Sequence, residues 1–85
     1  MNKKTVQITD KQLIIFLVCK QFKVVKVERD PGGNRSIIDF ENSEKLNQAL
    51  LDYTNKESSV NIADYLSAEK RVNNILYFNK NRMAI

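Results

Sequence analysis

The amino-acid sequence predicts one small α+β domain with the element order helix, β-hairpin, helix, helix. Three observations carry this prediction. A strong turn signal, Pro31-Gly32-Gly33-Asn34, separates two strand-like runs within residues 23–41. A helix-start signature precedes an apolar run at residues 13–19. Two later segments, 46–53 and 65–76, repeat apolar residues at helical spacing. An N-terminal edge strand is a further option, because residues 4–7 alternate weakly.

The register of the hairpin follows from its turn. A loop centred on Gly32-Gly33 brings apolar residues together on one face of the two strands and opposite charges together on the other. Turn, apolar face and charged face agree on one set of cross-strand pairs. These expected pairs are Val27 with Ile38, Val25 with Phe40, Lys26 with Asp39, and Asp30 with Arg35.

The first helix is expected within residues 8–22. Thr9 is its expected N-cap, and Gln12 completes a capping box three residues later. The helix is apolar on nearly every side, which is typical of a buried helix or of one that meets a second chain. Ile14 and Val18 need cover beyond the sheet, from the third helix or from a dimer mate. Seven consecutive apolar residues exceed what one face needs, which favours a contribution of this helix to a homo-oligomer.

The second and third helices are expected from their caps and apolar stripes. Asn42 or Ser43 can cap the second helix, and Asn61 caps the third. The third helix is expected to end near Asn79 and to leave a tail over residues 80–85. The two stripes are Leu46, Ala49, Leu50 and Tyr53 in the second helix, and Tyr65, Ala68, Val72, Ile75 and Leu76 in the third.

Length and composition indicate a single domain over residues 1–85, with an N-terminal lead at 1–7. The longest unbroken apolar run has seven residues, whereas a membrane-spanning helix needs about 20. Residues 3–7 do not resemble the start of a signal peptide. The single cysteine, Cys19, excludes an internal disulfide and indicates a reducing cytoplasm.

Charge is distributed unevenly along the chain. Residues 1–26 carry a net charge of +5, residues 27–69 carry −5, and residues 70–85 carry +4. If the two basic ends meet in the folded protein, they form a basic patch. Otherwise they only offset the acidic middle as a solvated surface.

The residue inventory argues against catalysis. The chain has no histidine and one cysteine, which excludes imidazole chemistry and a zinc site built on several thiolates. Gly32-Gly33 joins two strands, whereas a phosphate-binding loop joins a strand to a helix. Asp39, Glu41 and Glu44 are interpreted as a charged sheet face and a helix start. We therefore expect a non-enzymatic protein without cofactor, metal or small-molecule substrate.

Binding is the remaining class of function, and the sequence leaves two partners open. The first is a protein, including a second copy of the chain, with Ile14, Val18 and Ile37 as candidate interface residues. The alternative is DNA or RNA, because basic residues interleaved with aromatic ones suit phosphate contact and base stacking. Tyr77 and Phe78 would serve this role or complete the core. The candidate nucleic-acid-binding residues are Lys20, Lys23, Lys26, Lys70, Arg71, Lys80, Arg82 and Tyr77.

A family resemblance covers residues 8–77. The run ITDKQLIIFLVCKQF, a two-stranded unit, NSEKLNQALLDYTN and VNIADYLSAEKRVNNILY together resemble a family of short, uncharacterised bacteriophage and prophage proteins. In that family a glycine often precedes the Phe22 position, where this chain has Gln21. The resemblance implies a small phage-type protein in the cytoplasm of a bacterial host, acting by binding as an inhibitor or modulator of a host or phage protein. It brings no assigned activity and no catalytic residues.

Overall fold

A computed structural model describes residues 4–29 and 36–82 of the chain. Three helices and one three-stranded antiparallel sheet lie within these residues, which confirms the expected α+β class. The optional N-terminal edge strand is present as well. The elements in chain order are β1 (Thr5–Ile8), α1 (Lys11–Cys19), β2 (Val24–Arg29), β3 (Ser36–Glu41), α2 (Glu44–Thr54) and α3 (Ile62–Arg82).

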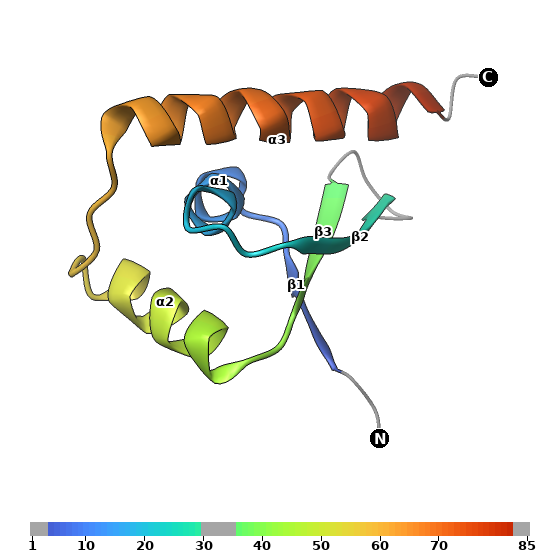
Figure 1. The fold of residues 1–85 in the computed structure, drawn as a ribbon. Coiled ribbons are helices and arrows are strands. Elements are labelled where there is room, and N and C mark those ends of the chain that lie inside the picture. Colours follow the sequence, from blue (N-terminus) through green and yellow to red (C-terminus); the bar gives the residue numbers. More distant parts are fainter. Residues whose placement is uncertain (1–3, 30–35, 83–85) are drawn as a thin grey trace.

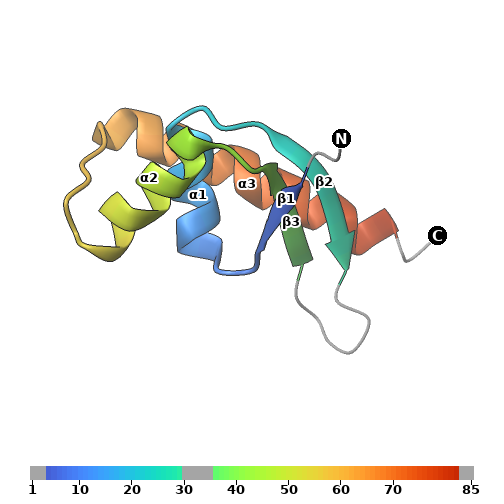
Figure 2. The same cartoon turned by 90° about the horizontal axis from the view of Figure 1, so that it is seen from below.

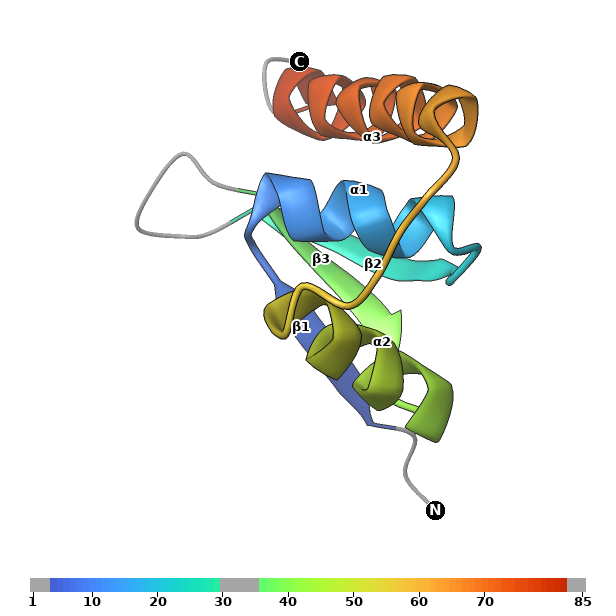
Figure 3. The ribbon, with the colours of Figure 1, turned by 90° about the vertical axis from the view of Figure 1, so that its left-hand side faces the viewer.

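The sheet has β3 at its centre and β1 and β2 at its edges. Figure 1 shows α1 beside the sheet, with α3 running over α1 and onward over β2 and β3. Seen from below in Figure 2, the strands lie in front of the C-terminal part of α3. Figure 3 shows α1 between α3 and α2. The first helix is therefore enclosed by the sheet and by both other helices.

This enclosure explains why α1 is apolar on nearly every side. Ile14 is 2% exposed and Val18 is 5% exposed. These are the two residues that were expected to need cover beyond the sheet. They share one buried cluster with Ala68 and Val72 of α3. Of the two kinds of cover that the sequence left open, the chain's own third helix is the one present in this fold.

The start of α1 differs from expectation by one residue. The N-cap is Asp10, whose carboxylate accepts hydrogen bonds from the backbone N–H groups of Gln12 and Leu13 at 3.0 and 3.3 Å. The prediction of Thr9 as the cap is wrong. Ile8 still belongs to β1, where it pairs with Ile38, so the chain turns into the helix one residue later than a cap at Thr9 requires.

Asp10→Ala is expected to lower the free energy of unfolding by about 1 kcal/mol, because two backbone donors lose their acceptor. Thr9→Ala is the matched control and should change it by less than about 0.5 kcal/mol. Urea unfolding of both variants tests the assignment. A larger loss for Thr9→Ala than for Asp10→Ala would restore Thr9 as the cap.

The end of α1 is closed by a left-handed residue. Gln21 has a φ of 73°, and its N–H donates to the carbonyl of Val18 at 2.9 Å. The N–H of Phe22 donates to the carbonyl of Leu17 at 3.0 Å. This pair of bonds is a Schellman cap, in which glycine is the preferred left-handed residue. Gln21 therefore occupies a position where the backbone conformation favours glycine.

Gln21→Gly is expected to raise the free energy of unfolding by about 0.5–1 kcal/mol, because the left-handed conformation costs a residue with a Cβ more than it costs glycine. Lys56, with a φ of 60° after α2, provides an independent repeat of the same change. Lys23→Gly is the control, because Lys23 does not have a positive φ: among the described non-glycine residues, Gln21 and Lys56 have one. Thermal and urea unfolding measure the effect. A gain for Lys23→Gly equal to that for Gln21→Gly would remove the conformational explanation.

The hairpin register is confirmed in its outer part and wrong near α1. Val27 lies opposite Ile38, and Lys26 lies opposite Asp39. A β-bulge then shifts the register, so Val24 takes the place opposite Phe40 that was expected for Val25. Val25 is 55% exposed, whereas Val24 and Val27 both pack against the core. Two core-facing residues three positions apart require one extra residue between them, and the bulge supplies it. The turn at 31–34 and the expected pair of Asp30 with Arg35 lie outside the described residues.

The second and third helices confirm the expected caps and stripes. The Ser43 hydroxyl accepts from the N–H of Leu46 at 3.1 Å, and the Asn61 side chain accepts from Ala63 and Asp64 at 2.9 and 3.1 Å. The residues of both stripes are buried or pack against the core. Helix α3 continues to Arg82, past its expected end near Asn79, because the sequence places no glycine or proline there to stop it.

Tyr53 joins α2 to the centre of the molecule. Its ring lies 5.1 Å from the ring of Phe16 in α1, measured between centroids. Burial raises the pKa of the Tyr53 phenol, and the nearby Asp10 and Tyr65 raise it further. The phenol is therefore neutral over the range in which proteins usually work, as suits a group packed between two helices.

Candidate nucleic-acid interface

A groove of about 530 Å³ lies between α3 and the chain segment that joins α1 to β2. The Schellman cap places Phe22 inward, and Lys23 follows at the entrance to β2. Arg71 reaches the same groove from α3. Its other lining residues are Val18, Gln21, Phe22, Val24 and Ile75, so basic side chains stand beside an apolar floor. We call it the α3–β2 groove.

The α3–β2 groove brings together the two basic ends of the sequence at one place. Lys23 belongs to the N-terminal basic segment, and Arg71 belongs to the C-terminal one. Local sequence patterns do not show that Lys23 and Arg71 lie beside one groove, because their proximity depends on α3 crossing over α1. Two like charges beside one groove attract an anionic group more strongly than either charge alone.

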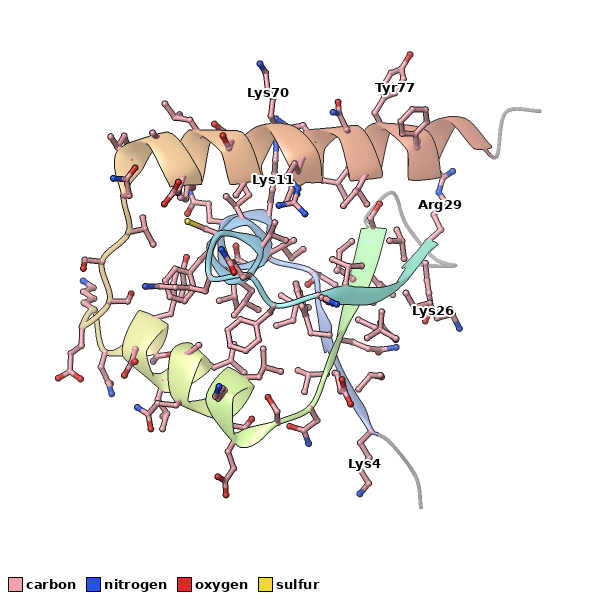
Figure 4. The ribbon with its side chains drawn as sticks, viewed as in Figure 1. Lys4, Lys11, Lys26, Arg29, Lys70 and Tyr77 are labelled. Carbon is pink, nitrogen blue, oxygen red and sulfur yellow. The ribbon has the colours of Figure 1, made fainter. Side chains whose placement is uncertain are left out.

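The outer side of α3 carries two aromatic side chains that the core does not use. Tyr77 and Phe78 are each 65% exposed, and their ring centroids lie 6.1 Å apart with an interplanar angle of 71°. Figure 4 shows Lys70 and Tyr77 pointing away from the sheet on the same side of α3. The alternative in which Tyr77 and Phe78 complete the core is therefore wrong.

Two of the remaining candidate cations, Lys20 and Lys26, lie on other surfaces. Lys20 donates to the backbone carbonyl of Ser59 at 2.9 Å and lies 5.7 Å from the Phe16 ring centroid, so it ties α1 to the loop before α3. Lys26 forms an ion pair with Glu28 at 3.6 Å and points away from α3 in Figure 4. The side chains of Lys80 and Arg82 lie outside the described residues.

Two further basic residues lie near these surfaces. Lys45 was missed from the sequence, whereas Arg29 belongs to the basic set that runs from the first helix into the first strand. Lys45 lines a second groove of about 400 Å³ with Lys20 and Lys23, on another side of the α1–β2 connection. It lies in residues 27–69, whose net charge is −5, so the charge of the segment does not indicate a basic site there. Arg29 ends β2, and Figure 4 shows it directed toward the C-terminal part of α3. Its direction toward α3 follows from the position of β2 beneath α3.

Part of the charge separation in the sequence is also a separation in space. From Lys70 onward α3 contains basic residues and no acidic residue. Helix α2, with Glu44 and Asp52, lies on the far side of α1 from α3. The acidic residues of α2 therefore lie away from the segment of α3 that begins at Lys70.

The candidate protein-interface residues have a different outcome. Ile14 and Val18 are core residues in this fold and present no surface to a partner. Ile37 is half-buried and lies opposite Glu28 in the sheet. The apolar surplus of α1, which motivated the interface, is covered from within the chain.

The described residues contain no group of three or more cysteine, aspartate or glutamate side chains placed to hold a metal ion. Within the same part of the chain, no helix combines the length and apolar character needed to cross a membrane.

Fold and surface together define a small α+β domain with a basic and aromatic side on its longest helix. The chain belongs to the family described as Domain of unknown function (DUF5659), whose match covers residues 3–78. Resemblance to an uncharacterised family is thereby confirmed. No curated protein and no solved structure matches the chain.

Proposed function

We propose that the protein is a non-enzymatic accessory protein that binds nucleic acid through the part of α3 from Lys70 onward and the α3–β2 groove. One observation carries this proposal: Tyr77 and Phe78 are both 65% exposed on the segment of α3 from Lys70 onward, which bears Lys70 and Arg71 and no acidic residue. Lys23 adds a further cation across the groove.

A surface of exposed cations and aromatic rings suits a nucleic acid. Phosphate groups are neutralised by lysine and arginine, and release of their counterions makes the binding salt-dependent. Aromatic rings add contacts to bases or sugars that cations alone do not supply. An exposed pair of rings is otherwise an unfavourable surface feature, because it leaves apolar area in water.

Direct titration tests the proposal. Untagged protein is titrated into labelled single-stranded and duplex DNA at about 50 mM and about 200 mM salt, and binding is followed by fluorescence anisotropy. We expect binding at the lower salt that weakens steeply at the higher salt. Absence of binding to both DNAs at the lower salt would refute the proposal.

A second candidate function is protein binding, including self-association. It is supported by Ile62 and Leu66, which are 70% and 54% exposed on the N-terminal half of α3. The resemblance to short bacteriophage proteins supports a phage-type inhibitor or modulator that acts in the cytoplasm of a bacterial host. If the partner is another protein, Leu66→Asp should abolish its stoichiometric recovery from nuclease-treated lysate. If the partner is a second copy of the chain, Leu66→Asp should lower the solution mass measured by light scattering. A wild-type monomer without such a partner would remove this candidate.

A further inference from the structure

We infer that the nucleic acid bound at α3 is single-stranded, with its bases stacked on Tyr77 and Phe78. This inference rests on the proposed function and names the substrate class of the same surface. It is carried by the placement of the two rings relative to the cations on α3.

The rings remain open to a ligand despite contacting each other. Their centroid distance of 6.1 Å and interplanar angle of 71° describe an edge-to-face pair. Each side chain is still 65% exposed, so the pair leaves flat aromatic surface in water. A planar base can cover that surface by stacking, and every base has a face suitable for it.

A duplex cannot use this surface in the same way. Its bases are already stacked on one another and paired, so only their edges reach the grooves. Rings that meet a duplex would touch sugar and phosphate and would remain largely unstacked. A single strand can turn its bases out onto the rings, which is how aromatic side chains contribute to single-strand binding.

The cations are spaced to follow such a strand. Lys70 and Tyr77 are seven residues apart, as are Arg71 and Phe78, and seven residues make nearly two helical turns. Each cation therefore lies on the same side of α3 as one ring, about 10 Å along the helix. Figure 4 shows this relation directly for Lys70 and Tyr77. A strand running along α3 would meet positive charge and then aromatic surface.

Charge also selects among the possible partners. An apolar helix from another protein could cover Tyr77 and Phe78, but it would leave Lys70 and Arg71 without opposite charge. The four basic residues and absent acids of segment 70–85 favour an anionic strand over a neutral apolar surface.

Two ring-directed variants test the inference. Tyr77→Leu with Phe78→Leu removes both rings from exposed positions and should weaken binding of an oligothymidylate of about 10 nucleotides by roughly tenfold or more. Ile62→Ala with Leu66→Ala is the matched control, since it also removes two exposed apolar side chains from α3. This control should leave the affinity within about twofold of wild type. Circular dichroism verifies that both variants keep their helices.

A tryptophan at the site reports stacking itself. The chain contains no tryptophan, so Tyr77→Trp introduces a unique fluorophore. We expect oligothymidylate to quench its emission and the matching duplex to leave it nearly unchanged. Equal affinity for strand and duplex, with no quenching and no effect of the leucine variant, would overturn the inference while nucleic-acid binding stands. Failure of both DNAs to bind would overturn the proposed function and the inference together.

Discussion

Replacing Val18 with lysine is expected to unfold the protein. Val18 is 5% exposed and lies in the cluster that α1 shares with α3. A lysine there must either bury an unpaired ammonium group or push α3 away from α1. We expect a loss of more than about 3 kcal/mol, which is a large part of the total stability of so small a domain. Circular dichroism and urea unfolding measure it.

Val25→Lys is the matched control for this prediction. Val25 is the same residue type, but the bulge in β2 leaves it 55% exposed. The free energy of unfolding should change by less than about 0.5 kcal/mol. Light scattering completes the comparison. A Val18→Lys protein that remains folded and becomes smaller than wild type would show that α1 is an interface between copies, contrary to the fold described here.

Reversing two charges on α3 should reduce DNA affinity on the order of 100-fold at low salt. Each phosphate contact contributes about 0.7–0.9 to the steepness with which the logarithm of the affinity falls with the logarithm of the salt concentration. The change is Lys70→Glu with Arg71→Glu, at two exposed positions of α3. The salt slope should fall by about 1.4–1.8 if both residues contact phosphates. Anisotropy titrations at several salt concentrations give affinity and slope together.

Lys4→Glu with Lys56→Glu separates a local contact from net charge. Either pair of substitutions changes the formal charge by −4, from +4 to 0. Lys4 stands far from α3 in Figure 4, and Lys56 follows α2. A site at α3 predicts a small effect for this control. Equal weakening by both pairs would mean that general charge, and not α3, governs binding.

Local signals predicted most of the fold. The caps at Ser43 and Asn61, the two helical stripes and the pair of Val27 with Ile38 depend on residues close in sequence or fixed by one turn. The bulge could not be predicted in the same way. It arises because Val24 and Val27 both pack against the core although they lie three positions apart, which strict alternation along a strand does not allow.

The candidate surface was only partly predictable. Local sequence identified Lys70, Arg71 and Tyr77, since they share one exposed stretch of helix. The meeting of Lys23 with Arg71 depends on the path of α3 over α1, which no local pattern encodes. Asp39 shows the same limit: it was interpreted as part of a charged face, yet it is 5% exposed and accepts from the Thr5 hydroxyl at 3.4 Å. Its burial follows from its place at the centre of the sheet.

The most direct test of the account is to observe which residues respond to a nucleic acid. Two-dimensional amide NMR spectra of labelled protein would be recorded during addition of oligothymidylate of about 10 nucleotides. We expect shifts concentrated at residues 70–78 of α3 and at Lys23 and Val24, with α2 nearly unchanged. Shifts centred on α2 or on β1, with the α3 signals left in place, would contradict it.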